Sequence, residues 1–276
     1  KTNHSTSSRD VNIVTAHTKG KVYITGAGPG DINLLTLRAK AVVELADVIL
    51  YDNLINPAIL DWAKPGAEKI FVGKLPYCSV ITQETIHLWL LDHARTGKQV
   101  VRLKGGDPLL FGRGGEEAVF LRENQIDFEI VPGVTSSLAA GSYAGIPLTH
   151  RDDAQMLLFV TGHTKRSNKT GLDFDWPMLA AFSGTIVFYM GVRNLDQIAA
   201  RLIDAGRSAD SLIAVVENAS LPQQKTVTGT LRNIAAKVLA EEIGTPALII
   251  VGEVVKYHQQ INWFSAIQEQ LKQQIA

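Results

Sequence analysis

The chain has 276 residues, of which 46% are hydrophobic and 20% charged, and its 27 basic and 27 acidic residues balance. That balance predicts binding neither to nucleic acid nor to an anionic membrane surface, so an anionic ligand would have to meet a local group of cations. A single cysteine, Cys78, excludes an internal disulfide and a cysteine-based metal site, and is typical of a reducing compartment such as the cytoplasm. The histidines lack paired metal-ligand spacing, which predicts no metal, and no apolar stretch reaches the about 20 residues of a membrane span.

Residues 1–20 are polar and unpatterned, and we expect them to form a disordered arm. After them, β-branched apolar runs alternate with segments whose apolar residues recur at helical spacing. The expected elements are a strand at 21–28, a helix at 31–46, a strand at 47–52, a short helix at 57–63, a strand at 69–73, a helix at 82–97, a strand at 99–106, a helix at 116–124, a strand at 128–133 and a helix at 136–145. Thr82 is the expected N-cap of its helix, and Gly97 follows that helix. This alternation predicts a parallel sheet with helices on its faces.

The alternation of strands and helices restarts after the segment IPLTHRDDA. The expected elements there are a strand at 156–162, a polar loop, a helix at 176–183, a strand at 185–191, a helix at 195–206, strands at 211–220 and 224–231, a helix at 231–243 and a final strand at 246–257. We therefore predict an α/β fold with two domains, 21–146 and 147–264, the second with more antiparallel character. Residues 265–276 form a polar tail, helical or frayed. Two such domains would enclose a cleft suited to a ligand.

Two glycine-rich loops follow expected strands. The first, GAGPGD at 26–31, partly matches a dinucleotide fingerprint, but Pro29 removes a backbone N–H that a pyrophosphate would need. The second, LKGGDPLLFGRGGEEA at 103–118, contains five glycines among charged residues. One or two glycines would be enough for a turn, so five indicate a ligand lying close to bare backbone. On these loops alone, a nicotinamide site and a purely structural turn for GAGPGD both remain open.

Ten segments, taken together and in order, carry a more specific signal: GAGPGD, YDNL, VGK, VVRLKGGDPLLFGRGGEE, VPGVTSSLAA, AGIPLTHRD, VTGH, YMGV, VVENAS and TPALIIVG. They closely resemble the tetrapyrrole methylase family, from about Lys21 to Phe264. The resemblance implies two α/β domains, a homodimer, and S-adenosyl-L-methionine bound in the cleft, with S-adenosyl-L-homocysteine as product. It further implies transfer of methyl groups to C2 and C7 of uroporphyrinogen III, giving precorrin-2 for sirohaem or cobalamin synthesis. A methylase of a later precorrin is the alternative within the family.

The same resemblance assigns roles to individual residues. Asp52 matches a proton acceptor, and Lys74 matches a proton donor. The positions that match cofactor contacts are Pro29, Gly105, Gly106, Asp107, Leu110, Thr135, Ser136, Met190, Ala219 and Ala247. Two departures from the family concern the substrate rather than the cofactor: Asn53 stands where the family commonly has arginine, and the segment 75–78 differs from its usual glycine and histidine.

A polycarboxylate such as uroporphyrinogen III needs cations at the cleft of this neutral chain. Arg113 can form a bidentate pair with a carboxylate, although an internal pair with Glu116 or Glu117 is an equal alternative. His150 and Arg151 are further candidates for substrate binding, and both could instead cap the domain junction. Two rival functions outside the family remain at this stage, a nicotinamide-dependent oxidoreductase and a non-catalytic nucleotide-binding module.

Overall fold

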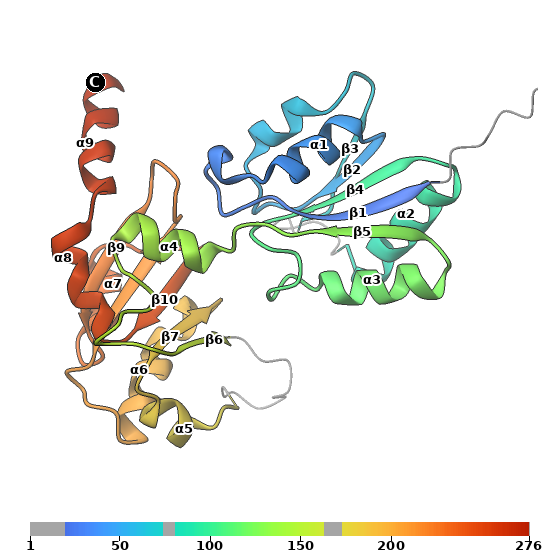
Figure 1. Cartoon of the computed structure of the whole chain (residues 1–276). Helices are drawn as coiled ribbons and strands as arrows, with labels where there is room; N and C mark the ends of the chain where they lie inside the picture. The colour runs from blue at the N-terminus through green and yellow to red at the C-terminus, as the bar shows by residue number, and fades with distance from the viewer. Residues whose placement is uncertain (1–19, 74–80, 163–172, 276) are drawn as a thin grey trace, which may run out of the picture.

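The computed structural model describes residues 20–73, 81–162 and 173–275, arranged in two lobes (Figure 1). The first lobe contains β1 (Lys21–Gly26), η1 (Ile32–Leu34), α1 (Leu37–Leu45), β2 (Val48–Tyr51), η2 (Pro57–Trp62), β3 (Glu68–Phe71), α2 (Gln83–Arg95), β4 (Gln99–Lys104), α3 (Gly114–Glu123) and β5 (Asp127–Val131). Its strands form a sheet in the order β3-β2-β4-β1-β5, and every pair is parallel. The predicted parallel sheet is therefore confirmed.

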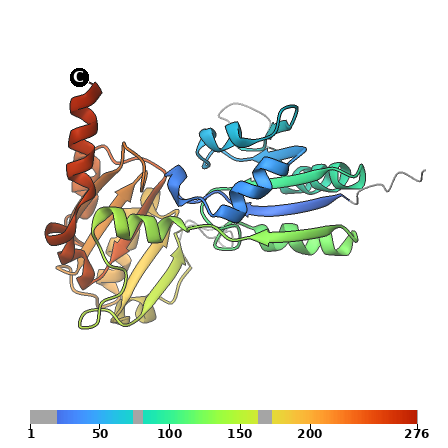
Figure 2. The same cartoon turned by 45° about the horizontal axis from the view of Figure 1, so that its top comes forward.

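Helices cover both faces of this first sheet. On one face, α1 and η2 pack Ala39, Val42 and Ile59 against Ile49 and Val101. On the other face, α2 and α3 pack Ile86 and Leu121 against the strand residues Val22, Ile24 and Leu50. Because all five strands run parallel, their carboxyl ends share one edge, and Figures 1 and 2 show that edge turned toward the second lobe.

The second lobe contains α4 (Ser136–Ala144), β6 (Leu157–Thr161), α5 (Trp176–Ala181), β7 (Thr185–Tyr189), η3 (Val192–Asn194), α6 (Leu195–Asp204), β8 (Leu212–Glu217), β9 (Lys225–Thr230), α7 (Ile234–Ala240), β10 (Ala247–Val251), η4 (Glu253–Tyr257), α8 (His258–Ile261) and α9 (Phe264–Ile275). Its sheet has the order β6-β7-β10-β8-β9. Only the β6–β7 pair is parallel among these five strands, so the expected antiparallel character is confirmed. α9 projects from this lobe (Figures 1 and 2).

Helix α4 packs on the second sheet, although it precedes the boundary that we predicted at residues 146 and 147. Its residues Ala139, Ala140 and Ala144 share a core with strand residues Val187 and Leu248. The opposite face of the same sheet is covered by α5, α6 and α7. The chain therefore passes between the two lobes along the segment that follows β5 and leads into α4.

Several element boundaries follow from local caps. Thr82 accepts a hydrogen bond from Thr85 N and begins α2, as predicted. The expected helix at 31–46 is instead η1 followed by α1, because Thr36 is in an extended conformation and caps α1 through Ala39 N. The expected final strand ends at Val251, since Gly252 has a φ of 151° and the chain continues as η4. None of the helices that the structure describes is long and apolar enough to cross a membrane.

Candidate active site

The loops that follow β1, β4 and β5 meet backbone to backbone at the carboxyl edge of the first sheet. Gly28 N donates to Gly106 O (3.2 Å), and Gly106 N donates to Gly28 O (2.7 Å). A Cβ on Gly26 would lie 2.6 Å from Gly106 O and 2.7 Å from the Cα of Gly133, distances that real Cβ atoms do not adopt. A Cβ on Gly133 would lie 2.3 Å from the same oxygen, so glycine is required at positions 26 and 133 for these backbones to touch.

Asp107 fastens two of these loops together. Its Oδ1 accepts hydrogen bonds from Leu109 N (2.9 Å) and Leu110 N (3.2 Å), which closes the turn after β4. Its Oδ2 accepts from Gly133 N (3.1 Å) in the loop after β5. The carboxylate that we predicted to contact the cofactor therefore also holds the loop geometry in place.

The loop that carries Asp52 lies beside the same edge. A Cβ on Gly105 would come within 2.7 Å of the Leu54 Cβ, so the missing side chain lets the Asp52 loop approach β4. Asp52 Oδ1 accepts from Leu54 N (3.0 Å), and 22% of the Asp52 side chain is exposed. A carboxylate at the end of a parallel strand, fixed by its own loop and open to solvent, is suited to act on a bound ligand.

The second lobe presents its predicted cofactor residues along one edge. Leu248 pairs with Tyr189 and Ala247 pairs with Glu217, so the end of β7, the start of β10 and the end of β8 are level. Met190 follows directly on β7, and Ala219 lies two residues after the end of β8. Of the ten predicted cofactor positions, the structure thus gathers those of the second lobe at one edge and those of the first lobe at the facing edge.

Direct contacts join the two edges. Asp31 N, in the loop after β1, donates to Ser220 Oγ (3.0 Å). Tyr189 Oη lies 2.7 Å from Thr135 Oγ1 and accepts from Ser137 N (3.3 Å), and its ring lies 4.9 Å from the ring of Phe111. The predicted residue Thr135 therefore lies where the two lobes are hydrogen-bonded.

Backbone strain and exposed apolar side chains coincide along these edges. Among the described residues with a side chain, those with positive φ at the site are Phe111 (55°), Arg113 (62°), Met190 (57°), Asn218 (50°) and Ser220 (69°). Such conformations cost free energy and concentrate at ligand sites. Large apolar side chains are also exposed at the site, namely Leu54, Leu109, Phe111 and Met190. The arrangement suits a ligand with a substantial apolar part.

Arg113 forms an internal ion pair. Its Nε donates to Glu116 Oε1 (2.9 Å), and its Nη2 donates to the other oxygen of that carboxylate. This hydrogen bonding raises the pKa of Arg113 above its ordinary value. Of the alternatives left open by the sequence, the structure shows the pair with Glu116, on the exposed side of α3.

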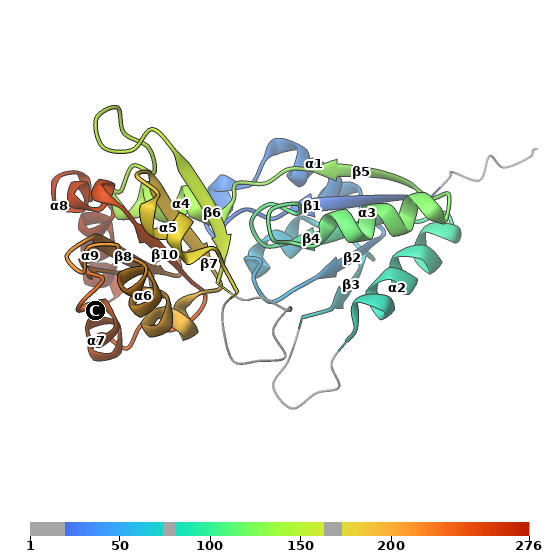
Figure 3. The same cartoon turned by 90° about the horizontal axis from the view of Figure 1, so that it is seen from below.

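The other predicted substrate residues are not brought to Asp52. His150 and Arg151 belong to a hairpin in which His150 N donates to Ala154 O (2.9 Å), and the His150 ring stacks on Tyr257 at 4.5 Å. The segment between α4 and β6 that holds them loops away from the first lobe (Figures 2 and 3). Lys74 lies outside the described residues.

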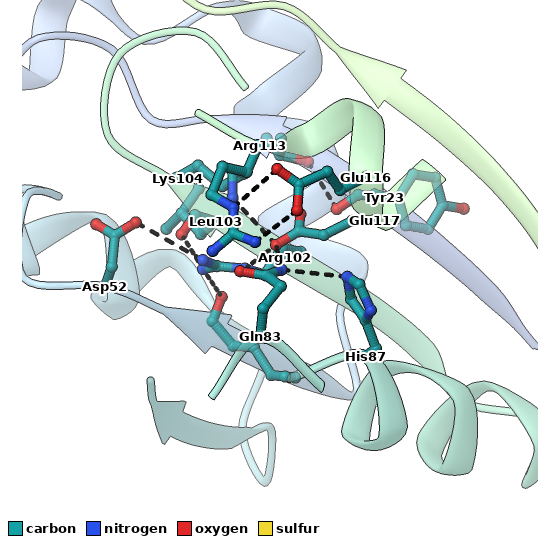
Figure 4. Close-up of polar contacts among 12 residues, drawn as sticks. Tyr23, Asp52, Gln83, His87, Arg102, Leu103, Lys104, Arg113, Glu116 and Glu117 are labelled. Atoms are coloured by element: carbon teal, nitrogen blue, oxygen red, sulfur yellow. Dashed lines mark hydrogen bonds and ion pairs between the residues drawn. The ribbon is translucent and has the colours of Figure 1, made fainter. Parts of the chain in front are cut away.

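A buried charge network beneath Asp52 was not predicted. Arg102 and Lys104 are two apart on β4, so both face α3, where each donates to Glu117 Oε1 at 3.1 Å (Figure 4). Burial would by itself raise the pKa of Glu117, but the two cations outweigh burial and hold that pKa below its ordinary value. Burial lowers the pKa of Lys104. The signal in the sequence was the alternation in VVRLK, where two cations interrupt an apolar strand.

No group of three or more histidine, cysteine, aspartate or glutamate side chains that could hold a metal ion occurs within the described ranges.

Comparison with known proteins identifies the family. The model for "Tetrapyrrole (Corrin/Porphyrin) Methylases" matches residues 21–235. A uroporphyrinogen-III C-methyltransferase of Bacillus subtilis is 49% identical over 90% of this chain and 95% of its own length. A siroheme synthase of Pseudoalteromonas atlantica is 48% identical over 90% of this chain, which spans 53% of that relative.

Solved structures of similar proteins indicate the same family. A uroporphyrin-III C-methyl transferase from Thermus thermophilus, complexed with S-adenyl homocysteine, is 44% identical with a TM-score of 0.73, covering 86% of this chain and 99% of that chain. A cobalt precorrin-4 methyltransferase is 31% identical with a TM-score of 0.78, covering 88% of this chain and 99% of that one. The chain belongs to the tetrapyrrole methylase family.

Proposed function

We propose that this chain is an S-adenosyl-L-methionine-dependent C-methyltransferase that methylates C2 and C7 of uroporphyrinogen III. The product would be precorrin-2, which serves sirohaem or cobalamin synthesis. The observation that carries the proposal is the meeting of the glycine loops after β1, β4 and β5 with the facing edge of β7, β8 and β10, in a chain 49% identical to a uroporphyrinogen-III C-methyltransferase. We assign the activity to the cytoplasm because a lone thiol is typical of reducing compartments.

The residues present fit S-adenosyl-L-methionine. A Cβ on Gly106, which has a φ of 67°, would meet Ser136 N at 3.7 Å and Thr135 Cα at 3.8 Å, so the backbone there is accessible without crowding. We assign its binding to the backbone around Pro29, Gly105 and Gly106 in the first lobe, and to the further predicted positions Asp107, Leu110, Thr135, Ser136, Met190, Ala219 and Ala247. When bound, this cofactor supplies a methyl group that its sulfonium already makes electrophilic.

The chain itself has to orient the substrate and handle one proton. A pyrrole carbon becomes a better nucleophile as its ring N–H proton leaves, and Asp52 is our candidate acceptor of that proton. The same carboxylate would stabilise a cationic pyrrole. Alignment of the reacting carbon, with water excluded by the lobes, can contribute roughly 7–11 kcal/mol in favourable cases. We keep Lys74 as the candidate proton donor.

Arg113 is our candidate for a substrate carboxylate, which would compete with Glu116 for its two N–H groups. We expect Arg113→Ala to weaken binding of uroporphyrinogen III more than binding of S-adenosyl-L-homocysteine. Calorimetry on the product cofactor and the KM for the substrate measure the two effects. An equal loss of both would assign Arg113 to loop structure. We also propose His150 and Arg151 as substrate-binding residues. The predicted domain limits and a homodimeric assembly are part of the same proposal.

The test of the function is anaerobic incubation with uroporphyrinogen III and methyl-labelled S-adenosyl-L-methionine, with the product followed by mass and absorbance. Two labelled methyl groups on the tetrapyrrole would support both the reaction and the substrate. An absence of transfer, with S-adenosyl-L-homocysteine still bound tightly, would point to a later precorrin. That outcome is worth testing because the likeness to the cobalt precorrin-4 methyltransferase is also close.

A further inference from the structure

The charge network beneath Asp52 contains two cations around one carboxylate. Arg102 and Lys104 are each 4% exposed and Glu117 is fully buried. Glu117 Oε1 accepts from Arg102 Nε, from Lys104 Nζ and from Gln83 Nε2, at 3.1, 3.1 and 3.0 Å. Burying an uncompensated charge is expensive, so a second negative charge is required nearby.

Asp52 supplies that charge. Its Oδ2 lies 3.8 Å from Arg102 Nη2, and it is the partly exposed member of the group. Leu50, two residues earlier on β2, is the Cα partner of Arg102 on β4, so Asp52 extends from the same face of the sheet as Arg102 and Lys104. Counting formal charges, two cations then face two carboxylates, one of them in the core and one at the site.

The guanidinium of Arg102 is fixed on its other sides. Nε is bonded to Glu117, and Nη1 donates to Leu103 O (3.1 Å) and to Leu50 O (3.4 Å). These bonds tie the arginine to β2, β4 and α3 together and leave Nη2 directed at Asp52 (Figure 4). A planar, always charged group with a fixed fork of donors is suited to orient a carboxylate.

We propose that Arg102, held by Glu117, is a positioning residue that aims the carboxylate of Asp52 at the substrate. The proposal rests on the proposed function, in which Asp52 handles the pyrrole proton. A purely structural role does not call for these charges, since well-packed apolar residues usually replace a buried ion pair without loss of stability. The neighbours of Arg102 on β4, Val101 and Leu103, are such residues.

The test compares Arg102→Gln with Arg102→Lys. The glutamine variant leaves Lys104 paired with Glu117, so the core stays balanced and the chain is expected to fold. We expect it to lower kcat roughly 10- to 100-fold, the scale of a misplacement of about 1 Å, with the KM for uroporphyrinogen III and the affinity for S-adenosyl-L-homocysteine unchanged. Arg102→Lys, which retains the charge, should recover part of kcat.

Two comparisons separate positioning from structure. Arg207→Gln is the matched control, because Arg207 also uses Nη1 to bond two backbone oxygens, Leu179 O (3.3 Å) and Phe182 O (3.1 Å), away from the site. It should lower stability and leave kcat unchanged. In single-turnover assays with labelled cofactor, Arg102→Gln should have no further effect in an Asp52→Asn background, since residues acting as a unit are not additive.

The possible outcomes distinguish a failure of the proposed function from a failure of this inference. If the wild-type chain transfers no methyl group, the proposed function fails and this inference fails with it. If the wild type is active and Arg102→Gln matches its kcat, the inference alone is wrong. It is also wrong if Arg102→Gln loses cofactor affinity and kcat together, or if its effect and that of Asp52→Asn multiply. Where Asp52→Asn shows no transfer at all, the contrast between the glutamine and lysine variants in kcat decides.

Discussion

Replacing Glu117 with glutamine tests whether the buried cations Arg102 and Lys104 depend on this carboxylate. The substitution keeps the shape of the side chain but removes the charge that three donors share at Oε1. The new amide NH₂ would occupy the place of Oε2, which has no hydrogen-bond partner among the described residues. Removing one partner of a buried ion pair costs about 3–5 kcal/mol, because an uncompensated charge is left in the core. We expect a loss of that size in the free energy of unfolding.

The assay is urea unfolding at pH 7, followed through tryptophan fluorescence, to which Trp89 contributes from α2, where it packs against the core. Glu116→Gln is the matched control, since Glu116 is the next residue of α3, has a 53% exposed side chain and pairs at the surface with Arg113. It should cost about 1 kcal/mol or less. Adding Lys104→Met to Glu117→Gln should restore part of the loss by removing one stranded cation. A loss for Glu117→Gln no larger than that of Glu116→Gln, or a further loss from Lys104→Met, would refute this account.

Two further predictions concern the glycines at the carboxyl edge of the first sheet and the stability of the fold at low pH. Gly133→Ala would press a Cβ into the carbonyl oxygen of Gly106, so we expect it to abolish S-adenosyl-L-homocysteine binding in calorimetry, whereas Gly115→Ala, with open space around its Cα, should bind normally. Hydrogen bonds from Arg38 and Lys21 lower the pKa of Glu129 from 4.5 to about 2. Its stabilising effect is therefore complete above pH 4.5 and lost as the pH falls toward 2. Glu129→Gln should cost about 1 kcal/mol or less at pH 7 and much less at pH 2, where about half of the carboxylate is protonated in the folded state; thermal unfolding measures both, and an equal cost at both values would contradict the assignment.

Much of the fold follows from patterns that lie within a single element. The period of apolar residues predicted most of the strands and helices of both lobes, and Thr82 marked the start of α2 because an N-cap acts within its own turn. What the pattern could not predict depends on partners distant in the chain. Ser136–Ala144 reads as a small-residue helix in either lobe, and only packing against β10 assigns it to the second sheet.

The candidate site also has features that the sequence predicts and features that it does not. The glycine loops were recognisable because several glycines in one loop are rare without a close approach of backbone. The roles of Glu116 and Glu117 were not distinguishable, because adjacent helix residues differ in sequence position by one and in direction by about 100°. The structure assigns the first to Arg113 at the surface and the second to the buried cations.

Strand β4 carries two of the charged residues of the buried network and leads into the glycine loop at 105–106. The strand therefore connects the proposed cofactor-binding loop to the residues around Asp52. Along β4, Val101 and Leu103 face the α1 side while Arg102 and Lys104 face α3. The strand then passes directly into Gly105, whose backbone allows the Asp52 loop to approach. A shift of β4 against α3 would therefore move the partner of Asp52 and the glycine loop together. The ion pairs of the core therefore help to fix the Asp52 loop relative to the glycine loop that follows β4.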